Sequence, residues 1–542
     1  MFPAGRELPG AWGGQRQWRI LETGFGSGLK FLACWRAWKD DPARPGLLHF
    51  VAMDARPVAA TDIVGAAADT AALAPLAAEL AGQGFGLTAG VHRMQFEDGR
   101  ILLTLFVGEM RDALRQQVFR ADSVVIDAWD PAALKAVARH CRRGTTIATD
   151  NVSAALGHGL AEAGFVMTPG ETHGMFNPAW QPRSRLAEVD IEPGHCTVIG
   201  AGLAGAAVAA SLARRGWRVI ALDIASSPAS GASGLPAGLL APHYSPDDSL
   251  LSRLSRCGVR TTLQQARHLL REGEDWALTG VLELRPDDFA MVEDAREAMR
   301  PWNRRAAQGN AIWHEQAGWI KPAPLVRAWL SQPGIEWRGE CEVQSIERSN
   351  GRWRVIATGG AVLDESELVV VTAATGSARL LGNRISTHPV RGQVSWGDQA
   401  GASLAPTPMN GSGHLIPSVP TSRGLAWYCG STYETGQDSL EERAADHQSN
   451  LERLRKLAPE AAAALAPSFA DGSVHVWTGV RCAATDRRPL LGEVEPGLWV
   501  STAMGSRGLT FAALCGELLA ARVHGEPFPL DRRLAQSLDI TR

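Results

Sequence analysis

The stretch Thr197-Val198-Ile199-Gly200-Ala201-Gly202-Leu203-Ala204-Gly205 decides the fold of the larger part of this chain. It has the pattern of a hydrophobic strand that runs into a glycine-rich turn and opens an alanine-rich helix. Gly216 is placed to end that helix, and a second apolar strand, Trp217 to Leu222, leads to Asp223. This order of elements predicts a Rossmann-type βαβ unit that binds a dinucleotide.

Each glycine of the turn has its own physical role. Gly200 allows the tight turn, Gly202 lets the backbone approach a pyrophosphate, and Gly205 lets the helix pack against the strand. The helix N-terminus stabilises the phosphate charge, and Asp223 can accept a hydrogen bond from a ribose hydroxyl. The acidic residue favours NAD or FAD over NADP.

Two further segments indicate FAD. Ser230 to Gly238 is a run of small residues after the acidic strand, and Gly505 to Thr510 enters a helix after a strand at Leu498 to Ser501. In this order they resemble the D-amino-acid oxidase and glycine oxidase family. The resemblance implies a helix N-terminus that faces the flavin and stabilises negative charge on the reduced ring. We therefore expect FAD to be bound by Gly200, Gly202, Gly205, Asp223, Gly231, Ala232, Ser233, Gly234, Gly505, Ser506, Arg507, Gly508, Leu509 and Thr510.

A closer resemblance rests on three other segments, which are His388-Pro389-Val390-Arg391-Gly392-Gln393-Val394-Ser395, Gly318-Trp319-Ile320-Lys321-Pro322-Ala323 and Gly479-Val480-Arg481-Cys482-Ala483. They resemble the oxidoreductase half of the MnmC family of bifunctional tRNA wobble-uridine modification enzymes. In that family a flavin domain oxidises the glycine-like arm of 5-carboxymethylaminomethyl-2-thiouridine. A methyltransferase domain then methylates the resulting amine with S-adenosylmethionine.

The implied oxidation needs a cation for the substrate carboxylate. The resemblance places Arg481 where glycine-oxidase-like enzymes hold a carboxylate-binding arginine, and a guanidinium pairs bidentately with a carboxylate. Arg507 is a second candidate, and either residue could instead be a structural or solvated arginine. The chemistry requires no side-chain base, so we expect His388 and His414 to be loop residues without a catalytic role.

A second glycine turn, Glu22-Thr23-Gly24-Phe25-Gly26-Ser27-Gly28, follows a strand that begins at Trp18 and precedes a helix from Leu29 to Trp38. Apolar runs at Leu47 to Met53, Ile101 to Phe106 and Ser123 to Ile126 are typical of a doubly wound parallel sheet. The turn resembles the methyltransferase motif of the MnmC family. The resemblance implies S-adenosylmethionine bound by Glu22, Gly24, Gly26, Gly28, Asp54 and Glu109, with Asp127 accepting a proton from the attacking amine or orienting it.

The chain departs from the family pattern after Asp127. The family continues with Gly-Phe-x-Pro-x-x-Asn-Pro, whereas this chain has Ala128-Trp129-Asp130-Pro131 and enters a helix, about ten residues earlier. A shortened active-site loop leaves two interpretations open: the domain either still transfers methyl groups, or is degenerate and only binds its cofactor or docks a partner.

The expected fold class is α/β, with a Rossmann-like methyltransferase domain followed by a Rossmann FAD domain and a mixed β-sheet substrate domain. We place a degenerate methyltransferase-like domain at residues 1–182, a linker at 183–195 and the FAD-dependent oxidoreductase domain at 196–542. Eight cysteines without a Cys-x-x-Cys pair argue against a metal site and indicate a cytoplasmic protein. A net charge of −3 means that a tRNA partner must be held by local basic patches. We expect no membrane association, and a monomer.

Two alternatives remain at this point. The chain could be a glycine or D-amino-acid oxidase with a vestigial N-terminal domain, in which case free glycine would reduce the flavin. It could also be a tRNA-binding scaffold without turnover, in which case the purified protein would not be yellow.

Overall fold

The computed structural model describes residues 11–181, 191–286, 302–306, 310–399, 401 and 404–542. The chain divides into two compact units. Unit 1 comprises Met1–Glu192 and Ala520–Ala535, and unit 2 comprises Pro193–Leu519 and Gln536–Arg542. Most of the predicted linker lies outside the described residues. The segment Ala520–Ala535, which the sequence analysis placed with the oxidoreductase domain, clusters with unit 1.

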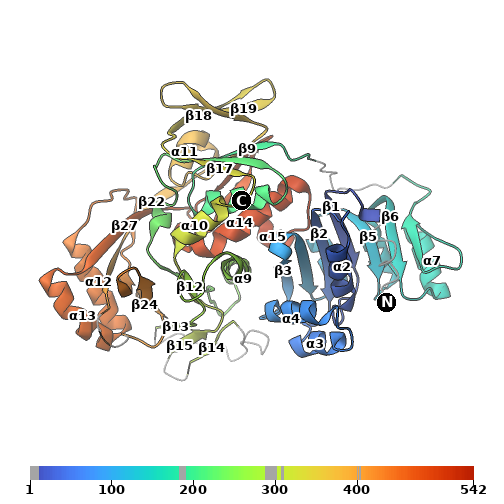
Figure 1. Ribbon diagram of the computed structural model, residues 1–542, viewed down its shortest axis with the longest axis horizontal. Helices are drawn as coiled ribbons and strands as arrows, with labels where there is room; N and C mark the ends of the chain where they lie inside the picture. Colours follow the sequence, from blue (N-terminus) through green and yellow to red (C-terminus); the bar gives the residue numbers. More distant parts are fainter. Residues whose placement is uncertain (1–10, 182–190, 287–301, 307–309, 400, 402–403) are drawn as a thin grey trace. The chain divides into compact units, whose positions relative to one another are not determined.

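Unit 1 is built around an eight-stranded sheet with the strand order β3-β4-β2-β1-β5-β6-β8-β7 (Figure 1). Five strands are parallel: β1 (Gln17–Glu22), β2 (Leu47–Asp54), β4 (Ile101–Val107), β5 (Ala121–Ile126) and β6 (Cys141–Thr149). At the edges, β3 (Gly90–Phe96) pairs antiparallel with β4, β8 (His173–Phe176) pairs antiparallel with β6, and β7 (Phe165–Met167) pairs antiparallel with β8. Because β2 and β5 flank β1, the winding of the chain reverses at β1. Parallel sheets bind ligands at such a switch point.

Helices cover both faces of this sheet. Ile20 and Phe50 belong to a core cluster with α2 (Leu29–Asp40), α3 (Ala60–Ala67) and α4 (Ala74–Gln83). The neighbouring positions Leu21 and Val51 belong to a second cluster with α5 (Met110–Gln116), α6 (Pro131–Ala138) and α7 (Ala154–Ala163). Strands buried on both faces need apolar residues at successive positions, which explains the uninterrupted hydrophobic runs in the sequence.

Unit 2 contains a six-stranded sheet with the order β17-β10-β9-β21-β29-β28. Its strands are β17 (Ile335–Arg338), β10 (Arg218–Leu222), β9 (His195–Ile199), β21 (Leu368–Val371), β29 (Leu498–Thr502) and β28 (Leu490–Glu495), of which only β28 is antiparallel. The helix α8 (Leu203–Ala213) connects β9 to β10. The predicted βαβ unit is confirmed, and the expected α/β class holds.

A nine-stranded mixed sheet forms the second part of unit 2 (Figure 1). Its strands are β14 (Arg304–Arg305), β15 (Ala311–His314), β13 (Val281–Leu284), β23 (Met409–Asn410), β24 (His414–Thr421), β25 (Gly424–Gly430), β22 (His388–Asp398), β26 (Glu434–Thr435) and β27 (His475–Ala483). Two helices, α12 (Ala444–Leu457) and α13 (Pro459–Asp471), share a core cluster with β24 and β25. His388 and His414 begin strands β22 and β24, so the expectation that they are loop residues is wrong: His388 pairs with Ala483 of β27, and His414 pairs with Gly430 of β25.

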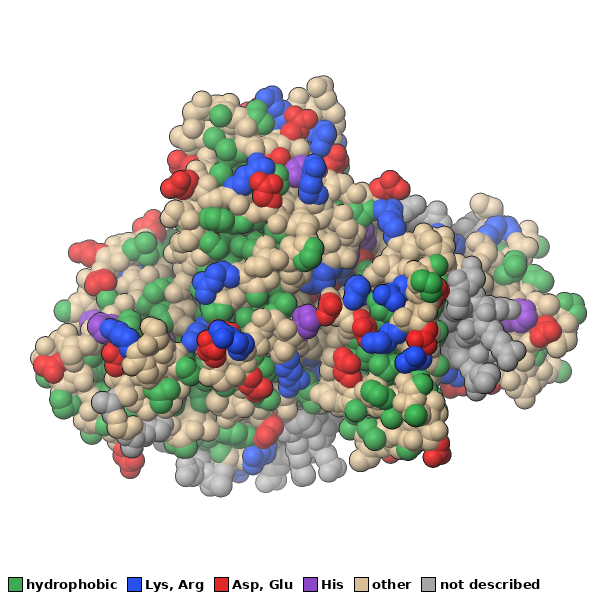
Figure 2. Space-filling model, viewed as in Figure 1, with side chains coloured by type: hydrophobic (Ala, Val, Ile, Leu, Met, Phe, Trp, Pro, Cys, Tyr) green, Lys and Arg blue, Asp and Glu red, His purple; other side chains and the backbone are tan. Residues whose placement is uncertain are grey.

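The remaining elements complete unit 2 and the C-terminal end. One three-stranded sheet consists of β11 (Gly238–Leu240), β16 (Gly318–Ile320) and β12 (Trp276–Ala277), and another consists of β18 (Val343–Ser349), β19 (Arg352–Ala357) and β20 (Val362–Ser366). The further α-helices are α9 (Leu250–Leu269), α10 (Pro322–Leu330), α11 (Gly376–Leu381), α14 (Gly508–His524) and α15 (Arg532–Gln536). Among the described residues, no helix combines the length and the apolar character that crossing a membrane requires. Figure 2 shows basic and acidic side chains interspersed over the visible face, in keeping with a net charge of −3.

Candidate cofactor and substrate sites

The glycine turn after β9 has no room for side chains at its closest approaches. A Cβ added to Gly205 would overlap the carbonyl oxygen of Gly200 and lie 2.6 Å from Oγ1 of Thr372. Gly200 has a φ of 110°, which a residue with a side chain rarely adopts. The turn is therefore packed as tightly as a dinucleotide loop requires.

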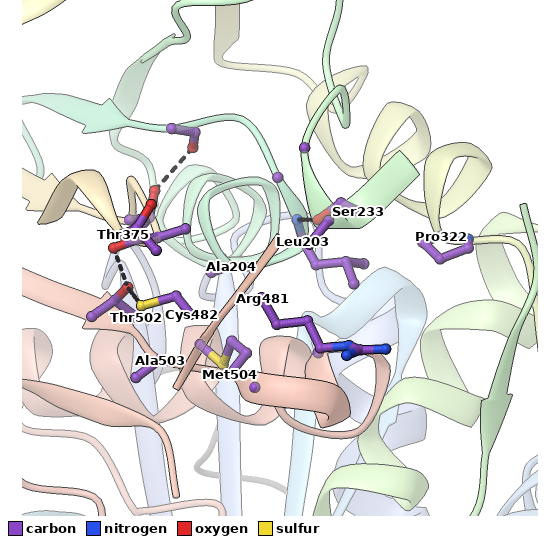
Figure 3. Close-up of a pocket in the computed structure, with 18 of the residues that line it drawn as sticks. Leu203, Ala204, Ser233, Pro322, Thr375, Arg481, Cys482, Thr502, Ala503 and Met504 are labelled. Carbon is purple, nitrogen blue, oxygen red and sulfur yellow. Dashed lines mark hydrogen bonds between the residues drawn. The ribbon is translucent and has the colours of Figure 1, made fainter. Parts of the chain in front are cut away.

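Polar groups from the neighbouring segments hold this turn in place. The Asp223 carboxylate accepts hydrogen bonds from the backbone N–H of Ala201 at 2.6 Å and of Ala225 at 2.9 Å. Ser233 Oγ accepts one from the N–H of Leu203, the first residue of α8, at 2.9 Å (Figure 3). The acidic strand end and the small-residue segment thus converge on the N-terminus of α8, where a phosphate would be bound.

A cavity of about 1000 Å³ opens beside this turn. Of the predicted FAD-binding residues, all except Gly205 and Gly234 line it. Gly205 instead packs beneath the turn, and a Cβ on Gly234 would lie 2.8 Å from the carbonyl oxygen of Ala229. The volume, the glycine turn and the helix N-terminus fit a flavin dinucleotide, which is large and carries a pyrophosphate.

The segment Gly505 to Thr510 forms one wall of the cavity at the start of α14. Thr262 of α9 donates a hydrogen bond from its hydroxyl to the carbonyl oxygen of Leu509 at 2.7 Å. Burial lowers the pKa of the Arg507 guanidinium, and the charge of Arg487 lowers it further. A cation and a helix N-terminus on one wall would favour an anionic, reduced flavin ring.

Arg481 reaches the same cavity from β27 (Figure 3). Its Nη2 donates a hydrogen bond to Ser431 Oγ at 2.7 Å, whereas the buried Nη1 has no hydrogen-bond partner among the described residues. Burial lowers the pKa of this guanidinium. An arginine with one unpaired buried nitrogen beside a cavity is placed to bind an anionic ligand group.

Sequence reasoning missed several residues that share the cavity with Arg481. They are Asn410, His414, Ser431, Tyr433 and Trp477. Burial and the charge of Arg481 lower the pKa of His414 to about 4, so this imidazole is neutral at pH 7. His414 pairs with Gly430 across β24 and β25, a register that no local sequence signal predicts.

Arg391, which belongs to one of the segments behind the family resemblance, has a structural role. It is fully buried, and its Nη1 lies 2.6 Å from the Asp446 carboxylate. Its Nε donates to the carbonyl oxygen of Ser439 at 3.0 Å, and Nη1 is 3.4 Å from Glu434. Arg391 therefore ties the segment after β25 to the mixed sheet, on which Arg481 also lies.

In unit 1 the glycine turn after β1 is closed by two acidic strand ends. Asp54 accepts a hydrogen bond from the N–H of Gly26 at 3.0 Å. The backbone N–H of Asp127 donates to Thr23 Oγ1 at 3.0 Å, and a Cβ on Gly24 would lie 2.7 Å from the Asp127 carboxylate. The structure thus brings Asp54 and Asp127 to the turn. Gly28 is the N-cap of α2 with a φ of 78°, and Glu109, the N-cap of α5, is exposed and contacts the helix through its backbone.

Lys30 and Asp150 were not singled out from the sequence but belong to this site. Lys30 Nζ lies 2.8 Å from Asp127, 3.2 Å from Asp150 and 3.9 Å from Glu22. Burial raises the pKa of Glu22 well above its usual value, and burial of Lys30 would lower the pKa of its ammonium, but its bonds to the acidic groups raise it overall. Asp150 could have been noticed because it follows β6 directly, at the same sheet edge.

The connection between β5 and α6 is as short as the sequence indicates. Asp130 is the N-cap of α6, and its carboxylate accepts hydrogen bonds from the N–H groups of Ala132 and Ala133, each at 2.8 Å. Only four residues therefore separate the last residue of β5 from Pro131.

Two family models match the chain. The model described as "FAD dependent oxidoreductase" matches residues 195–522, and the model described as "S-adenosyl-L-methionine-dependent methyltransferase" matches residues 71–175. Two solved structures resemble part of this chain in fold. Glycine oxidase from Geobacillus kaustophilus has a TM-score of 0.50 at 21% identity, over 64% of this chain and 98% of its own. Amadoriase I from Aspergillus fumigatus has a TM-score of 0.50 at 16% identity, over 65% and 91%.

Curated relatives match nearly the whole chain. A protein of Polaromonas sp. (strain JS666) is 49% identical over 99% of this chain and 93% of its own, and one of Paracidovorax citrulli is 47% identical over 100% and 94%. A protein of Ralstonia nicotianae is 37% identical over 100% and 92%. Each is named "tRNA 5-methylaminomethyl-2-thiouridine biosynthesis bifunctional protein MnmC". The first alignment spans 590 positions against 542 residues here, so that relative contains segments which this chain lacks.

Proposed function

The chain belongs to the MnmC family of bifunctional tRNA-modifying enzymes, and we propose that the two sites described above perform its two successive reactions. It is an FAD-dependent oxidoreductase combined with a methyltransferase that uses S-adenosylmethionine, and it modifies the wobble uridine of tRNA. The alternatives of a free glycine oxidase and of a scaffold without turnover are not favoured, because this chain matches both family models and its relatives over nearly the whole chain are named as bifunctional proteins.

In the first reaction the carboxymethyl group of 5-carboxymethylaminomethyl-2-thiouridine is removed. When bound, FAD supplies the oxidant that takes a hydride from the carbon between the amine and the carboxylate. Water then completes cleavage of the carbon–nitrogen bond, which leaves an aminomethyl group on the uridine and releases the two-carbon fragment as an aldehyde acid. In the second reaction that amine receives a methyl group.

We assign Arg481 as the residue that binds the substrate carboxylate. The observation that carries this assignment is that Arg481 lines the cavity bounded by the flavin segments while its buried Nη1 has no hydrogen-bond partner among the described residues. Its Nη2 is fixed by Ser431, so the guanidinium is already oriented before a ligand arrives. Arg507, from the segment Gly505 to Thr510, is the second candidate for this role, and its cation would stabilise charge on the reduced flavin.

The test of this proposal is anaerobic bleaching of the flavin absorbance by hypomodified tRNA that carries the carboxymethylaminomethyl arm, compared with free glycine. We expect the tRNA to bleach the flavin and Arg481→Met to raise the half-saturating tRNA concentration by about 30-fold or more, since truncating one partner of a buried charge pair has effects of this size. Arg481→Lys should be intermediate because it keeps the charge without the bidentate geometry. Arg423→Met, which removes an exposed arginine outside the cavity lining, is the matched control. Bleaching by glycine but not by tRNA would show that the enzyme is an amino-acid oxidase.

For the methyltransferase half we propose that Asp127 receives the proton of the acceptor amine. The support is its position against the glycine turn, where Gly24 leaves space for its carboxylate, and where the ion pair with Lys30 holds the carboxylate in place. As the family resemblance implies, we propose that S-adenosylmethionine is surrounded by Glu22, Gly24, Gly26, Gly28, Asp54 and Glu109. A tRNA substrate also supports a cytoplasmic location, and we propose that the protein acts there as a monomer.

A further inference from the structure

Tyr433 is an exposed aromatic residue at the cavity that holds Arg481. It lines the cavity, yet 46% of the residue's surface is accessible. Its ring centroid lies 5.8 Å from Cζ of Arg481. Single exposed aromatic residues are common on protein surfaces. Tyr433 differs from them in its anchored backbone and in its closeness to Arg481.

The residues on either side of Tyr433 are firmly held. Thr432 is buried, donates its N–H to the carbonyl oxygen of Gln393 at 3.2 Å, and accepts the N–H of Gln393 on its hydroxyl at 2.9 Å. Glu434 lies 2.9 Å from Arg443 and 3.4 Å from the fully buried Arg391. The chain thus presents one aromatic ring from a backbone anchored on both sides, which lowers the entropy lost when a ligand stacks on it.

The spacing of Tyr433 and Arg481 matches the proposed substrate. Four bonds connect the carboxylate carbon of the glycine-like arm to the uracil ring, a span of about 5 Å when extended. A carboxylate on Arg481 therefore places the base within reach of the Tyr433 ring, 5.8 Å from the guanidinium carbon. Aromatic side chains stack on nucleobases, and free glycine has no base to stack.

We infer that Tyr433 stacks on the extruded wobble base while Arg481 holds the carboxylate of its arm, so that the pair selects a nucleobase bearing a glycine-like arm over a free amino acid. This inference rests on the proposed function. It assigns Tyr433 a role in substrate specificity that differs from the roles of the flavin-binding residues.

The test compares the binding of two anticodon stem-loop RNAs to the FAD-loaded enzyme. One carries the armed uridine at the wobble position, and the other carries an abasic nucleotide there. The measured quantity is the dissociation constant of the abasic RNA divided by that of the armed RNA. Tyr433→Ala should lower the wild-type ratio by about 5-fold to 150-fold, the usual effect of losing one base-stacking side chain. Tyr433→Phe, which keeps the ring, should restore the ratio to within about twofold.

Two control variants distinguish loss of the aromatic ring from loss of exposed apolar surface in general. Tyr433→Leu keeps apolar bulk without a ring and should behave as Tyr433→Ala does. Leu425→Ala removes a similarly exposed apolar side chain, 44% accessible, from β25 outside the cavity lining, and should leave the ratio unchanged. A wild-type ratio near one would refute the proposed function and this inference with it. A large wild-type ratio that survives in Tyr433→Ala, or that Tyr433→Phe fails to restore, would refute only the role of Tyr433.

Discussion

Gly392 sets the position of Arg481. The two residues lie on neighbouring strands, β22 and β27, and the guanidinium crosses the face of Gly392 so closely that an added Cβ would lie 2.6 Å from Nη2. Gly479 pairs directly with Gly392 in the same register, and a side chain there would overlap the Trp477 ring. The carboxylate site therefore depends on missing side chains as much as on the arginine.

Gly392→Ala should accordingly weaken substrate binding without removing FAD. The added methyl group displaces the flexible end of Arg481, so we expect the half-saturating concentration of armed tRNA to rise by about tenfold, a ΔΔG of the size seen for displaced charged hydrogen bonds. The flavin absorbance should persist. Because the effect acts through Arg481, the double variant Gly392→Ala/Arg481→Met should be no worse than Arg481→Met alone. Additive losses would show that Gly392 acts on something else.

At the scale of elements, the decisive feature is the connection between β5 and α6. Asp127 follows β5 directly, and Asp130, three residues later, already caps α6. The acidic group stays at the sheet edge beside Gly24 and Lys30, although only three residues separate it from Pro131, where α6 begins. The strand end, not the loop, holds this carboxylate in place.

Methyl transfer should therefore persist and depend on Asp127. With labelled S-adenosylmethionine and tRNA that carries the aminomethyl group, we expect label on the tRNA, and Asp127→Asn should lower the rate by about 100-fold or more, the usual contribution of a proton acceptor. Asp130→Asn removes the same charge nearby but keeps a capping side chain, so it should retain most of the rate. No label with the wild-type protein would identify a degenerate domain. Full activity of Asp127→Asn would remove Asp127 from the mechanism.

At the scale of the molecule, unit 1 is assembled from both ends of the chain. Nη2 of Arg93 on β3 donates to the carbonyl oxygen of Pro527 at 2.6 Å. Gln117 accepts the N–H of Phe528 at 3.0 Å. His49 on β2 is fully buried, and its Nε2 lies 3.7 Å from the Glu526 carboxylate. The C-terminal segment thus supplies polar partners to the interior of unit 1.

This arrangement predicts a pH-dependent stability for unit 1. Burial lowers the pKa of His49 to about 4, against the attraction of Glu526, which raises it. The folded state therefore holds His49 neutral, and the unfolded state binds the proton first. The contribution of His49 to the free energy of unfolding is fully present above pH 6.5. It is lost as the pH falls from 6.5 towards 4, by on the order of 3 kcal/mol. His140, whose pKa is also lowered by burial, adds a loss of the same sign.

The measurement is hydrogen–deuterium exchange of the β2 amides in the intact protein between pH 6.5 and pH 4.5, corrected for intrinsic exchange. His49→Gln should reduce the pH dependence of the opening free energy. The remaining slope should combine the loss from His140 with an opposing gain from Glu22, whose raised pKa makes the folded state bind a proton before the unfolded state does. An unchanged slope in His49→Gln would contradict the role of His49.

The sequence by itself determined the two glycine turns, the parallel sheets that carry them and the family, because these depend on short-range patterns. The apolar strand, the glycines of the turn and the acidic residue that ends the next strand all lie within about 25 residues of each turn. The same local order predicted the positions of Gly205 and Asp223. Local patterns also predicted that Asp127 ends a strand and that a helix begins near Pro131, but the approach of Asp127 to Gly24 is set by the pairing of β1 with β5.

Only the tertiary structure decided which residues meet across the mixed sheet and across the chain ends. Register and packing between distant segments bring Gly392 against Arg481 and place Tyr433 and His414 in one cavity. They also bring Lys30 to Asp127 and assign Ala520–Ala535 to unit 1. Strand register is fixed by burial of one sheet face over its whole length, and a one-residue slip would turn every side chain to the other face. Such contacts produce no local periodicity, so no single stretch of the sequence predicts them.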